Sequence, residues 1–115
     1  MTLTARAIPI ASKQQLDQLI EGIRHYPDKT VRDEFINSFG GAVEHWFYQE
    51  VEGRPFLIAV IEGEDFGAGF EQYAASNQPF FLWFRQQVLD LTGVDMREVP
   101  GAATSEYVFK FCKEC

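Results

Sequence analysis

The sequence is short of cysteine, histidine and positive charge, and each shortage argues against a class of protein. Two cysteines and two histidines leave little material for a metal site or a disulfide-stabilised fold, so we expect no metal and no cofactor. A net charge of −7 would repel nucleic acid and anionic membranes. No apolar run approaches the roughly 20 residues of a membrane span. We therefore expect a cytoplasmic protein that binds neither nucleic acid nor membrane.

Apolar and aromatic residues are plentiful. Hydrophobic residues make up 46% of the 115 residues and aromatic residues 15%, with eleven phenylalanines among them. A chain of this length and composition buries enough apolar surface to fold without disulfides, and it is too hydrophobic to be disordered. We expect a single domain spanning residues 1–115.

Residues 42–62 predict a β-hairpin, around which the other elements are arranged. Two runs of alternating side chains flank a turn predicted at residues 52–55. The second run is apolar on both faces, so both faces need to be covered. Its two sets are Phe56, Ile58 and Val60 on one face, and Leu57, Ala59 and Ile61 on the other.

Helices are predicted on both sides of the hairpin in sequence. Ser12, followed three residues later by Gln15, has the spacing of a helix-capping box. A second helical piece is predicted from about Thr30 to the glycines at 40 and 41, and a short one around Phe70 and Tyr73. Proline at 79 favours a further helix over residues 79–91. The stripe of the first helix is Leu16, Leu19, Ile20 and Ile23.

The order of elements predicts the fold class. With a first strand at residues 3–10 and a last strand at 106–113, the chain reads as strand, helices, strand, strand, helices, strand. This is the ferredoxin-like βαββαβ arrangement, an α+β fold whose four-stranded antiparallel sheet carries helices on one face. The other face would remain apolar and uncovered, so we expect a homodimer that pairs through it.

The chain resembles the dimeric α+β barrel superfamily, which includes the antibiotic-biosynthesis monooxygenases. The resemblance rests on the hairpin HWFYQEVEGRPFLIAVIEGE followed by FEQYAASNQPFFLWFRQ, a strand, short helix, small-residue break and aromatic helix. The monooxygenases commonly carry a histidine near that break, where this chain has Ala75 to Pro79. The resemblance therefore implies an uncharacterised branch, which is not necessarily enzymatic.

One face of the first hairpin strand carries a candidate site. Trp46, Tyr48 and Glu50 alternate on this face, and a carboxylate among aromatic rings has a raised pKa suited to proton transfer. The simpler interpretation is dimer-interface packing with the carboxylate at the rim. His45 lies on the opposite face beside Phe47, where a half-buried core histidine is the more frequent outcome than a catalytic base.

Two functions stay open at this point. The first is a homodimer that binds a small apolar or aromatic molecule between sheet and helices. The second is a cofactor-independent monooxygenase or isomerase with Glu50 or His45 as its base. The expected lining of the binding site is Trp46, Tyr48, Glu50, Tyr73, Asn77, Trp83 and Arg85.

The chain ends in a C-x-x-C pair, Cys112 and Cys115. A redox motif needs its first cysteine at a helix N-terminus, whereas this pair follows a predicted strand. We expect two inert thiols.

Overall fold

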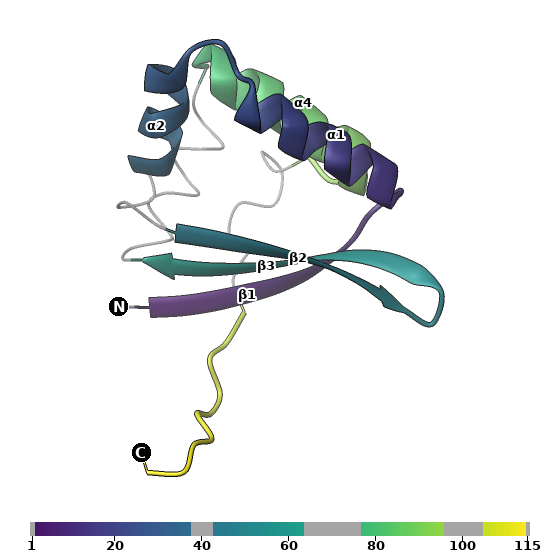
Figure 1. Cartoon of the computed structure of the whole chain (residues 1–115), viewed down its shortest axis with the longest axis vertical. Helices are drawn as coiled ribbons and strands as arrows, with labels where there is room; N and C mark the ends of the chain where they lie inside the picture. Colours follow the sequence, from purple (N-terminus) through teal and green to yellow (C-terminus); the bar gives the residue numbers. More distant parts are fainter. Residues whose placement is uncertain (1, 38–42, 64–76, 96–104, 115) are drawn as a thin grey trace.

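The fold is α+β, with an antiparallel sheet covered on one face by helices (Figure 1). The computed structural model describes residues 2–37, 43–63, 77–95 and 105–114. Within these residues the sheet has three strands in the order β1-β3-β2. The elements are β1 (Thr2–Pro9), α1 (Lys13–Arg24), α2 (Lys29–Asn37), β2 (Val43–Val51), β3 (Arg54–Gly63) and α4 (Pro79–Thr92).

The hairpin of β2 and β3 forms as predicted, with a tighter turn. Glu52 and Gly53 have φ angles of 52° and 77°, the left-handed conformation that two-residue hairpin turns require. The pair Val51 and Arg54 closes the turn, so Arg54 and Pro55 belong to β3 rather than to the loop. Since β3 is the central strand, this turn determines which residues of β2 share a face with which residues of β3.

The helix ends follow the local signals. The Ser12 hydroxyl accepts a hydrogen bond from the Gln15 N–H at 3.1 Å, which caps α1. Asp28 Oδ1 accepts from two backbone N–H groups at the start of α2, those of residues 30 and 31. Helix α4 begins at Pro79 and ends at Gly93, whose φ of 76° is the left-handed conformation of a C-cap. The expected short helix around Phe70 and Tyr73 lies outside the described residues.

The core lies between the sheet and the helices. Helices α1 and α4 run side by side over the sheet, and α2 stands across their ends (Figure 1). Leu57, Ala59 and Ile61 of β3 point toward these helices and are buried. The predicted stripe of α1 supplies Leu16 and Leu19, and α4 supplies a block of rings. The buried hydrophobic residues are Ile10, Leu16, Leu19, Leu57, Ala59, Ile61, Phe80, Phe81, Phe84 and Leu91.

The opposite face of the sheet is not covered by any described element. We call it the open sheet face; its apolar members are Leu3, Ala5, Ala7 and Pro9 of β1, Val43, Phe47 and Val51 of β2, and Phe56, Ile58 and Val60 of β3. Phe47 is 57% exposed there. β3 is therefore apolar on both faces, but the described helices cover only one of them.

The predicted fourth strand is not shown. Residues 106–113 have no strand conformation and extend away from the sheet on the side opposite the helices (Figure 1). A strand depends on a neighbour for its backbone hydrogen bonds, and among the described residues this end of the chain meets the sheet through hydrogen bonds of Ser105 with Thr4 and Ala5. The observed strand order does not contradict a ferredoxin-like fold.

Candidate functional site

The most unusual ionisable group lies on the helix-facing side of β2. The hairpin register pairs Glu44 with Ile61 and Trp46 with Ala59, so both β2 side chains point toward the helices. The Trp46 indole Nε1–H donates a hydrogen bond of 3.0 Å to Glu44 Oε1. The Trp46 ring lies 6.5 Å from that of Phe84 on α4, between centroids. The Glu44 carboxylate is therefore held in place at the margin of the aromatic core.

Burial raises the pKa of Glu44 above its ordinary value of 4.5. Removing a carboxylate from water penalises its charged form, and the single hydrogen bond from Trp46 offsets only part of that penalty. A carboxyl group whose pKa is raised holds its proton more readily than an ordinary glutamate, which is the property that a general acid or base requires. The sequence pattern favoured Glu50 for this role and did not single out Glu44, although Glu44 shares the same strand face.

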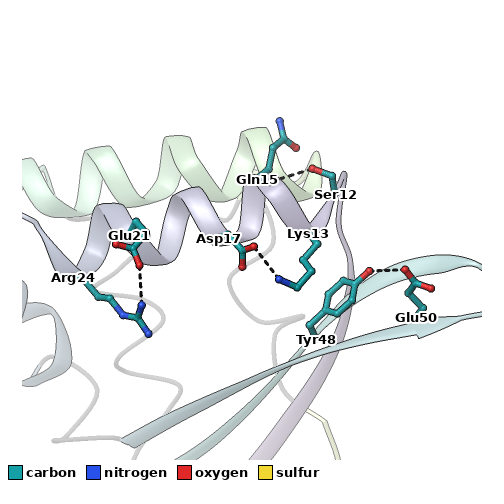
Figure 2. Close-up of polar contacts among 8 residues, drawn as sticks. All are labelled: Ser12, Lys13, Gln15, Asp17, Glu21, Arg24, Tyr48 and Glu50. Atoms are coloured by element: carbon teal, nitrogen blue, oxygen red, sulfur yellow. Dashed lines mark hydrogen bonds and ion pairs between the residues drawn. The ribbon is translucent and has the colours of Figure 1, made fainter.

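Glu50 lies at the exposed end of the strand. Figure 2 shows the Tyr48 hydroxyl pointing toward Glu50, with a hydrogen bond of 2.9 Å from Tyr48 Oη to Glu50 Oε1. This hydrogen bond to the carboxylate, together with lesser contributions from desolvation and from the charge of Glu50, raises the pKa of Tyr48. Lys13 Nζ lies 5.9 Å from the Tyr48 ring centroid. Glu50 is exposed to solvent. It lies one residue before the end of β2, next to the two-residue turn that leads into β3.

The aromatic pair Trp46 and Tyr48 faces the helices and packs against the core. The interpretation of this pair as dimer-interface packing on the uncovered face is therefore wrong. The hairpin register places Val43, Phe47 and Val51 on the uncovered face instead. Alternation assigned the two sets correctly, but it could not show which set the helices cover.

His45 is exposed and not part of the core. It belongs to the open sheet face, where its Nε2 lies 3.7 Å from Glu62 Oε1 on the neighbouring strand. This contact is long for a hydrogen bond, and the side chains are 50% and 38% exposed. The prediction of a core histidine is wrong, because the helices cover the other side of the sheet. Its position does not bring it near Glu44 or Glu50, which point to the opposite face.

Trp83 is packed between two helices. Its indole lies against Gly22 of α1, and its ring centroid is 5.4 Å from Tyr26 and 5.7 Å from Phe80. Phe80 in turn stacks on Phe84 at 5.8 Å. These rings contact one another directly, so the described space between sheet and helices is occupied by packed side chains.

The remaining predicted site residues are dispersed. Asn77 is exposed before α4, Tyr73 lies outside the described residues, and Arg85 is buried. Arg85 borders a half-open depression of about 120 Å³, smaller than the roughly 300 Å³ at the lower end of ligand pockets. The other residues of this depression are Leu82, Gln86, Leu89 and Asp95. The structure therefore brings Trp46, Tyr48 and Trp83 to the aromatic core but places Glu50, Asn77 and Arg85 elsewhere.

Cys112 is disulfide-bonded, so the expectation of two inert thiols is wrong for this residue. Among the described residues, no cluster of three or more histidine, cysteine, aspartate and glutamate side chains is arranged to hold a metal ion. The described part of the chain also lacks a helix with the length and apolar character of a membrane span.

Comparison of the chain with models of protein families, with curated proteins and with solved structures gave no match. The functional argument therefore depends on the open sheet face and on Glu44.

Proposed function

We propose that this protein functions as a homodimer whose two subunits pair through their open sheet faces. The observation that carries the proposal is the composition of this face. All three strands contribute apolar side chains to it, and Phe47 and Val43 are more than half exposed. Apolar patches of this kind on a monomer usually mark an interface.

A second copy of the chain is the occupant that the face itself favours. The polar groups on the open sheet face include the weakly paired His45 and Glu62, which lie beside each other on adjacent strands. With a net charge of −7 the chain repels other acidic proteins over most of its surface, so the mainly apolar open sheet face is the surface on which two copies can approach. Two twisted sheets pack face to face about 10 Å apart through such side chains.

Light scattering at micromolar concentration tests the dimer. The expected mass is twice the 13.2 kDa of the chain. Phe47→Glu places a charge on the open sheet face and should give a monomer that remains folded, because Phe47 is 57% exposed and contributes little to the core. Leu82→Glu is the matched control: Leu82 is similarly exposed, at 47%, but lies on α4, and this variant should stay dimeric. A wild-type chain of single mass would refute the proposal.

A small apolar or aromatic ligand between sheet and helices stays a prediction. The rings of Trp46, Trp83 and Phe84 have suitable chemistry for it, but they are packed against neighbouring side chains. A thermal-shift screen of aromatic compounds, repeated on Trp46→Phe, tests it: a ligand at this position should lose most of its stabilising effect in the variant.

A second candidate function follows from Glu44. A cofactor-independent isomerase or oxygenase of the dimeric α+β barrel type needs a base, and the half-buried Glu44 with its raised pKa fits that role better than Glu50 or His45. Compounds that stabilise the wild type but not Glu44→Gln, while still stabilising Glu50→Gln, would favour this enzyme. If both variants keep every ligand, Glu44 has no part in binding.

A further inference from the structure

The end of the chain is an exposed apolar segment. We call residues 106–114 the C-terminal arm. Tyr107, Phe109 and Phe111 alternate along it, and the two phenylalanines are 75% and 92% exposed. Alternating aromatic residues are typical of a strand with one buried face, yet the arm has no strand partner among the described residues. Aromatic side chains this exposed are expected to be covered in the functional form of the protein.

The arm begins at the free edge of β1 in its own chain. The Ser105 N–H donates to Thr4 Oγ1 at 3.1 Å, and the Ser105 hydroxyl accepts from the Ala5 N–H at 2.9 Å. From there the arm, yellow in Figure 1, leaves the sheet on the side of the open sheet face. It therefore points toward the space that a second subunit would occupy.

The free edge of β1 is a poor place for the arm to pair. The register directs the backbone groups of Leu3, Ala5, Ala7 and Pro9 away from β3, toward this edge. Ser105 already takes the N–H of Ala5, and proline lacks an N–H. Only two backbone donors of β1 then remain for an added strand.

The free edge of β2 is better suited. Val51 and Arg54 form the hydrogen-bonded pair that closes the hairpin. Along β2, every second residue counted back from Val51 therefore directs its N–H and C=O toward β3, and the residues between them direct theirs toward the free edge. The residues presenting both an N–H and a C=O to this edge are Glu44, Trp46, Tyr48 and Glu50. None of the four is a proline, so an added strand would find four donors and four acceptors in a row.

The side chains of the arm match those of β2. An added strand that places Tyr107, Phe109 and Phe111 on the open sheet face sets them beside Val43, Phe47 and Val51. The same alternation turns Lys110 toward the helix side together with Glu106 and Glu114, where the β2 residues include Glu44 and Glu50, so charge does not decide between the edges. Apolar contact on the open sheet face favours the edge of β2.

We propose that the C-terminal arm of one protomer adds a fourth strand to the free edge of β2 in the second protomer. This inference rests on the proposed dimer. A two-fold axis parallel to the strands places β1 of one sheet over β2 of the other, because the strand order is reversed across the axis. The arm must then cross a gap of about 10 Å, and its eight residues at 106–113 span about 26 Å when extended. Each sheet becomes four-stranded, and each dimer carries two such exchanges.

Thiol trapping in the full-length chain tests the exchange. Cys115 is first replaced by serine in every chain, and chains carrying Glu50→Cys together with Cys112→Ser are mixed with chains that keep Cys112, because the arm starts level with His45 of the partner's β2 and only its later residues can reach position 50. Both positions are exposed, and the proposed pairing turns them to the same side of the sheet. A short bismaleimide should join one chain of each kind into a species of twice the 13.2 kDa mass. Gln18→Cys, exposed on α1, replaces Glu50→Cys in the control and should give no such species.

The outcomes separate the arm from the dimer. A dimeric mass in light scattering without a link between positions 50 and 112 would overturn the arm exchange and leave the proposed dimer standing. A Cys112→Ser chain with both Ala7→Cys and Val108→Cys that links internally, at single mass, would place the arm on its own β1 and also overturn the exchange. A monomeric mass for the unlinked wild type would remove the dimer and the exchange together.

Discussion

A Cβ atom built on Gly22 of α1 would lie 2.6 Å from Cζ2 of Trp83 on α4. No real Cβ tolerates such a distance, so the missing side chain at Gly22 is what allows the two helices to pack through this indole. The indole cannot simply turn away, because Tyr26 and Phe80 contact it on other sides. A helix-interior glycine, normally unfavourable, is here required by tertiary packing.

Gly22→Ala should therefore destabilise the protein. In an exposed helix this change would stabilise by about 1 kcal/mol, whereas overpacking against Trp83 should cost about 1–3 kcal/mol. Urea denaturation checks the sign. Trp83→Phe combined with Gly22→Ala supplies the control, because removing the larger ring should recover part of the loss. If Gly22→Ala raises the midpoint, Trp83 does not constrain the spacing of α1 and α4.

Glu44 should make stability depend on pH in the acid range. Its pKa is raised in the folded state, so protonation favours folding: the contribution is fully present below the unfolded value, near 4.5, and is lost as pH rises through the folded pKa. Glu44→Gln removes this dependence. The free energy of unfolding of wild type relative to Glu44→Gln should therefore increase as pH falls from 7 toward 4.5, measured by denaturant titration at several pH values. Equal pH profiles would show that Glu44 is solvated.

Glu50→Gln should affect folding little. Glu50 is exposed, and glutamine retains an oxygen that can accept from the Tyr48 hydroxyl, so stability should change by no more than about 1 kcal/mol. The pKa of Tyr48 should fall toward its ordinary value of 10.0, because the hydrogen bond to a carboxylate is the main cause of its rise. Ultraviolet titration of tyrosinate measures this shift, with His45→Gln as a control on the opposite face that should leave it unchanged. An unaltered Tyr48 titration would contradict the contact.

Replacing Cys112 and Cys115 by serine should leave the melting temperature within a few degrees of that of the wild type. Cys112 is disulfide-bonded and lies in the exposed C-terminal arm, outside the hydrophobic core, so loss of the bond should change little in the packed part of the chain. Calorimetry of the double variant checks the stability, and elemental analysis checks for metal. Stoichiometric zinc in the wild type that disappears in the double variant would show that the two cysteines bind metal, and would contradict this prediction.

Local signals in the sequence were sufficient for most of the described elements. The turn at Glu52 and Gly53, the cap at Ser12 and the end of α4 at Gly93 each depend on the backbone preferences of one or two residues, and all three are where the sequence predicted an end or a turn. Alternation in β2 and β3 likewise assigned residues correctly to two faces, since successive side chains of a strand point to opposite sides.

The choice between those two faces was decided only by tertiary structure. β3 is apolar on both sides, so its sequence contains no signal for which side the helices cover. That single choice buries Trp46, raises the pKa of Glu44 and exposes His45 and Phe47. The last segment shows the same limit: its alternation predicts a strand, but a strand needs a neighbouring edge, and which edge it meets depends on contacts between distant parts of the fold or between subunits.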